Sequence, residues 1–150
     1  MKIHDCMMEA FDEILERMAF MYFEELEDKS NTEGTDQYDY VTEISFSGAI
    51  TGKFNLFINE NHGKLIARNL LGIRDEDTLL EGTIDDAICE FTNMIIGRTM
   101  TLINSNRKFD LGIPFITELS EKSTNEEDTL QVKGLLEEYP CMLLLKYRFW

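Results

Sequence analysis

Residues 83–104 combine a helical period with two faces of different character. Apolar and small residues recur there at three- and four-residue steps, which places one set on a single side of a helix: Ile84, Ala87, Ile88, Phe91, Ile95, Thr99 and Leu102. That side must be buried, so the spacing predicts a long helix over Thr83–Asn104. Thr83 followed by Asp86 resembles a capping box and predicts where this helix begins.

The opposite side of this predicted helix carries a carboxylate and an amide one turn apart. Four residues fall within about a 60° arc at 3.6 residues per turn: Asp86, Glu90, Asn93 and Gly97. Large apolar residues flank this line, where a solvated face would carry charged side chains: Met94, Ile96 and Met100. We therefore expect a partner to cover this face, with these partner-binding residues: Asp86, Met94, Ile96, Gly97 and Met100.

Simpler interpretations exist for the same residues. Capping and the helix dipole account for the residue type of Asp86 without any partner. An ordinary solvated helix face accounts for Glu90 and Asn93 when their spacing is considered alone. Gly97 costs up to about 1 kcal/mol of helix stability relative to alanine, and close approach of another backbone is one reason for its presence.

Before this helix, the pattern predicts a long amphipathic helix and then a β-hairpin. Apolar residues from Asp5 to Glu27 recur at helical steps between acidic ones, and 28–36 has the composition of a loop. Apolar and polar residues then alternate on both sides of a turn at Gly48–Gly52, which predicts two paired strands. The alternating residues are Tyr38, Tyr40, Thr42, Ile44 and Phe46 in the first strand, and Phe54, Leu56 and Ile58 in the second.

The remaining elements are shorter. Residues 59–63 resemble a helix start, Lys64–Leu71 a short helix with Leu65, Ile66 and Leu70 inward, and Gly72 its C-terminal glycine. An apolar segment at 111–119 places Pro114 at a strand end or edge, and 120–128 has a charged loop composition. Two strands, Thr129–Leu136 and Cys141–Phe149, end the chain.

These elements predict an α+β fold in one domain over residues 1–150. We expect an antiparallel-rich sheet of about five or six strands covered by two long helices, because no βαβ alternation with a nucleotide fingerprint occurs. The core is expected to include the following side chains: Phe11, Met18, Phe46, Leu56, Ile88, Phe91, Ile95 and Leu143.

Composition and charge narrow the function. The net charge of −15 opposes binding to nucleic acid and to anionic membrane surfaces. No apolar run approaches the roughly 20 residues that span a bilayer, and the N-terminus lacks a leader pattern, so we expect a cytoplasmic protein. Cys6, Cys89 and Cys141 are far apart and without metal-ligand spacing, so we expect no metal or organic cofactor in this chain.

With these residues in view, the chain resembles the CheC/CheX/FliY family of chemotaxis phosphatases, and the CheX type in particular. The resemblance rests on the order of elements, the hairpin ISFSGAITGKFNLFI, and Asp86-xxx-Glu90-xx-Asn93-xxx-Gly97 followed by Pro114 in LGIPF. CheC-type members carry a second such motif in the first helix, whereas FDEILERMAF has no Asn three residues after an acid. One site per chain is therefore expected.

The resemblance implies that the chain dephosphorylates the phospho-aspartate of a CheY-type receiver, as a homodimer, with Glu90 and Asn93 catalytic. Glu90 would pair with the receiver's lysine and Asn93 would orient water, while the divalent metal would belong to the receiver. Two alternatives remain. A binding or adaptor module would dock a partner through the same face without turnover, and a structural dimer subunit would bury Glu90 in a permanent interface.

Overall fold

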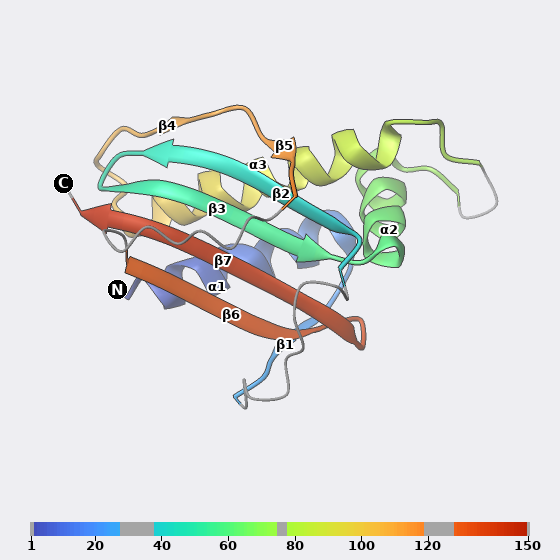
Figure 1. Cartoon of the computed structure of the whole chain (residues 1–150), viewed down its shortest axis with the longest axis horizontal. Coiled ribbons are helices and arrows are strands. Elements are labelled where there is room, and N and C mark those ends of the chain that lie inside the picture. The colour runs from blue at the N-terminus through green and yellow to red at the C-terminus, as the bar shows by residue number, and fades with distance from the viewer. Residues whose placement is uncertain (1, 28–37, 75–77, 119–127, 150) are drawn as a thin grey trace.

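An antiparallel sheet with its helices on one face makes up the fold (Figure 1). The computed structural model describes residues 2–27, 38–74, 78–118 and 128–149. The predicted loop at 28–36, and all of the one at 120–128 except Asp128, lie outside these residues. The seven strands are ordered β1-β6-β7-β3-β2-β4, with β5 also paired to β2. The α+β class is confirmed.

The elements follow in this order along the chain: α1 (Ile3–Ile14), the π-helical turn η1 (Leu15–Ala19), β1 (Phe23–Glu25), β2 (Tyr40–Ser47), β3 (Ile50–Ile58), α2 (Glu60–Leu71), α3 (Thr83–Ile103), β4 (Asp110–Leu111), β5 (Phe115–Ile116), β6 (Asp128–Leu136) and β7 (Tyr139–Phe149). The hairpin and the two final strands are confirmed. Pro114 lies between the short strands β4 and β5, both at the edge beside β2. This is the expected position for a residue without an N–H.

The alternation of side chains places one row of residues under the helices. Thr42, Leu56 and Leu143 are register partners in turn across β2, β3 and β7, and all three are buried. β7 is buried on both faces, because Met142 and Leu144 pack with Phe57 on the side away from the main core. The apolar run of the last strand is thus explained by its place between β3 and β6.

One glycine is required by the sheet itself. A Cβ atom at Gly52 of β3 would lie 1.8 Å from the carbonyl oxygen of Lys146 in β7. No side chain fits at that distance, so this position explains one of the two hairpin glycines.

The first helix is shorter than its spacing predicts. α1 and η1 end at Ala19, Phe20 adopts a left-handed conformation with φ of 54°, and β1 begins at Phe23. From Met21 onward the apolar residues follow a strand period, with Met21 and Phe23 buried and Tyr22 exposed. The prediction of a helix to Glu27 is therefore wrong, because a short strand was interpreted as two further helical turns.

Most of the predicted core is confirmed. The following side chains are buried: Phe11, Phe46, Leu56, Ile88, Phe91, Ile95 and Leu143. Met18 lies in the π-helical turn and is 39% exposed, so its place in the predicted core is wrong. In α2, Ile66 is buried as expected and Leu70 is half-buried, but Leu65 is 39% exposed.

The two later helices begin in different ways. The Asn59 side chain accepts a hydrogen bond from the His62 backbone N–H at 2.8 Å and the His62 Nδ1 accepts from the Asn59 N–H at 3.2 Å, which forms a capping box for α2. Gly72 ends α2 in the left-handed conformation. α3 begins after Gly82, also left-handed, without a side-chain cap. The predicted capping box of Thr83 and Asp86 is therefore wrong, and Thr83 is the first helical residue.

Candidate functional site

Two buried threonines fix the rotation of α3 over the sheet. The hydroxyls of Thr92 in α3 and Thr42 in β2 are 2.7 Å apart, and the Thr92 hydroxyl also donates to the Ile88 carbonyl at 2.7 Å. A buried polar contact of this kind has strong directional requirements, since leaving either group unpaired costs about 1–3 kcal/mol. It turns the neighbouring Asn93 away from the sheet.

The other side of α3 carries the predicted line of polar residues. Asp86 and Glu90 are exposed, and Asn93 and Gly97 are half-exposed. Neither the Glu90 carboxylate nor the Asn93 amide forms a hydrogen bond or ion pair with another residue in the described part of the chain. The helix thus presents an acid and an amide less than one turn apart, both available to a ligand or partner.

A salt bridge holds α3 against α1 at one flank of this face. The Arg98 Nε donates to the Glu13 carboxylate at 2.7 Å, and Arg17 lies 3.2 Å from the same carboxylate. The hydrogen bond from Arg98, reinforced by its charge, lowers the pKa of Glu13. This contact joins two rigid helices, so the site lies on a fixed surface and not on a loop.

A hollow of about 380 Å³ opens beside Glu90, between the end of α2 and the first turns of α3. Its lining is mostly apolar and consists of Leu70, Leu71, Thr83, Asp86, Ala87 and Glu90. Sequence reasoning missed Leu70 and Leu71 as site residues, because it placed α2 in the fold only as a short covering helix. The sequence signal that could have drawn attention to them is a pair of leucines directly before the glycine that ends α2, and in the structure Leu71 is 53% exposed.

Two of the predicted partner-binding residues do not lie on the outward face. Ile96 and Met100 are buried in the main core, and a Cβ at Gly48 in the β2–β3 turn would lie 2.9 Å from the Met100 Cε. α3 packs against α1, α2 and the sheet together, so its buried arc is wider than a single stripe. Only Met94, which is half-buried, remains beside the polar line.

Packing among the residues that the structure describes does not require a glycine at position 97. A Cβ there would lie 3.7 Å from the Leu111 Cδ1, which is an ordinary van der Waals contact. The Thr101 hydroxyl donates to the Gly97 carbonyl at 3.0 Å, and an alanine would leave that bond unchanged. Close approach of another described segment of the backbone therefore does not explain the glycine.

The described residues contain no cluster of three or more His, Cys, Asp or Glu side chains arranged to hold a metal ion. Burial raises the pKa of the Cys141 thiol, and the pKa of the Cys89 thiol is shifted in the same direction by burial and then by Asp85 and Asp86. Both effects oppose thiolate formation. Among the helices described, none is long and apolar enough to cross a membrane.

A family model identifies the family of this chain. The model named chemotaxis phosphatase CheX matches residues 40–133, from β2 through α3 into β6. This chain belongs to the CheX family. The matched range contains Glu90 and Asn93 and omits α1.

Solved structures of CheX and related proteins share the fold. CheX from Desulfovibrio desulfuricans is 16% identical with a TM-score of 0.76, and the match covers 99% of this chain and 100% of that one. A CheX–CheY–BeF3–Mg2+ complex from Borrelia burgdorferi is 16% identical with a TM-score of 0.73, covering 98% of each chain. FliY from Thermotoga maritima is 14% identical with a TM-score of 0.57, covering 96% and 86%. A search of curated protein sequences finds no match.

Proposed function

We propose that this CheX-family chain hydrolyses the phospho-aspartate of a CheY-type receiver domain through Glu90 and Asn93. The observation that carries the proposal is the pair itself. An exposed carboxylate and a half-exposed amide lie three residues apart on one rigid helix, without partners in the described part of the chain. A family named for phosphatase activity, and a CheX of the same fold in complex with CheY, support this class of reaction and partner.

Asn93 orients the attacking water in this mechanism. Its amide offers one acceptor and two donors, which can hold a water in line with the phosphorus, but it cannot take up a full proton near neutral pH. The water oxygen bonds to phosphorus, the bond to the aspartate oxygen breaks, and the proton that the water loses passes to the phosphate, so that the products are the free carboxylate and inorganic phosphate. A divalent ion held by the receiver would stabilise the developing charge, and no cofactor is proposed for this chain.

Glu90 anchors the partner in the same mechanism. A lysine in the receiver's active site would form a charge-assisted hydrogen bond with the Glu90 carboxylate and so fix where Asn93 enters. The net charge of −15 favours encounter with a positively charged feature of the receiver. Asp86, Met94 and Gly97 would contact the receiver along the same line of the helix.

The experiment measures phosphate release from phosphorylated receivers, beside a binding titration at two salt concentrations. Glu90→Ala should weaken receiver binding and make it less sensitive to salt, because the removed group is charged and intermolecular. Asp85→Ala is the control, because it removes an exposed carboxylate from the same helix but outside the line of Asp86, Glu90 and Asn93. It should leave receiver binding and its salt sensitivity nearly unchanged.

A binding module without turnover is the alternative function. If the wild-type chain binds the phosphorylated receiver but does not change its rate of dephosphorylation, that alternative replaces the phosphatase proposal. The presence of both Glu90 and Asn93 favours the enzyme, since docking alone gives no use for a water-orienting amide.

We also propose that the chain acts as a homodimer in the cytoplasm, from the family resemblance. The apolar sequence of β7 gives no support to a dimer, because this strand lies between β3 and β6 inside the sheet. Light scattering at micromolar concentration should give about twice the monomer mass of 17.5 kDa. A mass of 17.5 kDa would reject the dimer.

A further inference from the structure

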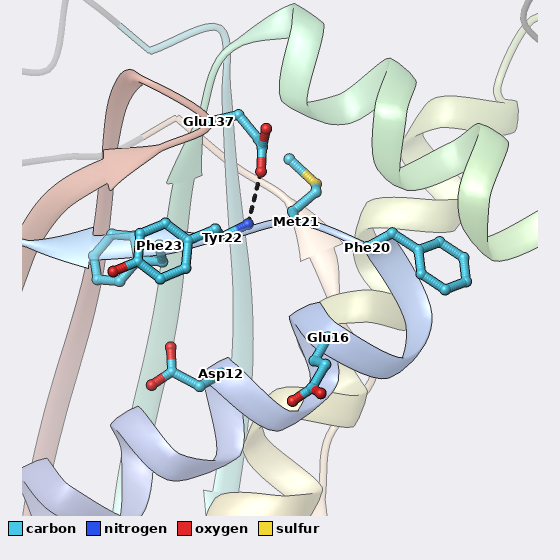
Figure 2. A pocket seen from close by; sticks show the side chains of 7 residues that line it. All are labelled: Asp12, Glu16, Phe20, Met21, Tyr22, Phe23 and Glu137. Carbon is cyan, nitrogen blue, oxygen red and sulfur yellow. Dashed lines mark hydrogen bonds between the residues drawn. The ribbon is translucent and has the colours of Figure 1, made fainter.

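A second hollow, larger than the one beside Glu90, lies where α1 ends. It has a volume of about 660 Å³ and lies between the end of the first helix, the segment before β1 and the β6–β7 turn. Seven residues line it: Asp12, Glu16, Phe20, Met21, Tyr22, Phe23 and Glu137 (Figure 2). None of them is a lysine, arginine or histidine.

The hollow is rigidly built. The left-handed Phe20 turns the chain sharply from the helix toward β1. The Tyr22 N–H donates to the Glu137 carboxylate at 2.7 Å, and the Glu137 N–H donates to the Tyr22 carbonyl at 3.1 Å. The Asn69 side chain of α2 donates to the Ala19 carbonyl at the other end of the turn. These bonds hold the backbone of the segment that carries Phe20 and Tyr22.

Two large aromatic side chains stand out of the surface here. Phe20 is 74% exposed and Tyr22 is 73% exposed, whereas Met21 and Phe23 point into the core. Figure 2 shows the rings of Phe20 and Tyr22 at opposite ends of the segment, with Asp12 and Glu16 on one side of it. Exposed rings of this size beside a hollow mark a contact surface, since they gain nothing from water.

Negative charge surrounds these rings. The carboxylates of Asp12, Glu16 and Glu137 form no ion pair with any residue that the structure describes. Partial desolvation of its carboxylate, and then repulsion from Glu25, raise the pKa of Asp12 although the side chain remains exposed. On the other side of Tyr22, an adjoining hollow of about 320 Å³ adds Glu24 and Glu138. A cation bound here would relieve this repulsion.

We propose that this hollow binds a basic, extended segment of a partner protein, with an arginine side chain held by Asp12 and Glu16 against the ring of Phe20 or Tyr22. The proposal goes beyond the phosphatase function and does not depend on it. Guanidinium groups pair with carboxylates through two parallel hydrogen bonds and stack on aromatic faces, so both kinds of group present here favour arginine. Phosphate-bearing ligands would be repelled.

The sheet edge supports an extended occupant. β1 is the last strand in the order, so one side of it has no sheet partner among the described residues. A segment that runs along this edge would place alternate side chains toward the two hollows on either side of Tyr22.

The test is a binding titration by fluorescence anisotropy with the intact chain, at about 150 mM salt, where charges are screened beyond about 8 Å. The probe is a short labelled peptide of alternating arginine and serine, beside its lysine and glutamate counterparts. A variant with Asp12→Asn, Glu16→Gln and Glu137→Gln should bind the arginine peptide at least about tenfold more weakly. Phe20→Ala should weaken it by about threefold and the lysine peptide by less.

A second triple variant, Glu81→Gln, Asp110→Asn and Glu118→Gln, changes the net charge equally at exposed positions elsewhere. It should lower affinity by less than about twofold, since these charges are far from the bound peptide. An equal loss in both triple variants, or no binding by the wild type, would overturn the proposal. The double variant Phe20→Ala, Tyr22→Ala gives a further test. If it changes from dimer to monomer and still binds the peptide, the proposal is also overturned, because a second copy of the chain would then occupy the hollow.

Discussion

The outward face of α3 and the end of α1 carry the same acidic spacing but present it differently. Asp86 and Glu90 in α3 are four positions apart and line one hollow, and Asp12 in α1 and Glu16 in η1 are four positions apart and line the other. Three residues after the second acid, α3 has the half-exposed Asn93. The first helix has Ala19 there, fully buried in the π-helical turn.

The difference arises from the backbone on the C-terminal side of the acids. α3 is a regular helix of 21 residues that continues past Glu90 to Ile103, so Asn93 stays on the outward line. The extra residue of the π turn rotates Ala19, the third residue after Glu16, toward the core. The first helix then ends at Phe20. The same spacing of two acids is therefore followed by an accessible amide in α3, the group proposed to orient water, and by a buried alanine in the first helix.

The largest expected effect comes from making α3 resemble the first helix. Asn93→Ala should lower phosphate release by about 10²-fold or more, on the order of 3 kcal/mol, with receiver binding largely retained. The fold should persist, because substitutions at such surface positions usually change stability by under about 0.5 kcal/mol. Asn61→Ala, an exposed amide on α2, is the matched control and should have no effect. Full activity of Asn93→Ala would remove the water-orienting role.

The reverse change should not create a second site. Ala19→Asn would place an amide in a fully buried position, which costs about 3 kcal/mol through overpacking and lost hydration. Urea denaturation should show a lower midpoint, whereas Met18→Asn at the exposed neighbouring position should change it little. A stable Ala19→Asn chain with increased phosphate release would mean that the first helix can also act catalytically.

Periodicity predicted the polar line on α3 because that inference needs only one helix. Asp86, Glu90 and Asn93 are found outward by arithmetic on a single element. The burial of Ile96 and Met100 depends on which elements pack around α3, including the β2–β3 turn at Gly48, and a sequence pattern does not contain that information.

The end of the first helix was missed for a local reason. Neither glycine nor proline marks the stop at Phe20, and Met21, Tyr22 and Leu26 fit a helical spacing as well as a strand. This segment forms a strand and not a helix because β1 pairs with β6, a contact between residues more than 100 positions apart. The hollow with Glu137 depends on the same long-range pairing, so no local pattern of residues could indicate it.

A smaller effect tests the turn that shapes the acidic hollow. Phe20→Gly should stabilise the fold by about 1 kcal/mol, because glycine adopts φ of 54° without strain and the Phe20 ring buries little surface. Phe20→Ala keeps the Cβ atom and should leave the free energy of unfolding nearly unchanged. If both variants have the same midpoint in urea, the left-handed conformation carries no cost at this position.

The smallest expected effect concerns the glycine on the α3 line. Gly97 lies inside a helix with a negative φ, and a Cβ there meets only Leu111 at an ordinary distance, so Gly97→Ala should stabilise the chain by about 0.5–1 kcal/mol. Gly52→Ala is the opposing control and should destabilise it strongly, because its Cβ would overlap the Lys146 carbonyl. Thermal unfolding measures both.

The same Gly97→Ala variant also tests whether a partner approaches α3 closely. If the receiver backbone lies against Gly97, the added methyl group should weaken receiver binding while the chain itself becomes more stable, so that stability and activity change in opposite directions. A chain that is more stable and fully active in phosphate release would remove Gly97 from the contact surface. The outward line would then narrow to Asp86, Glu90 and Asn93, with Met94 beside them.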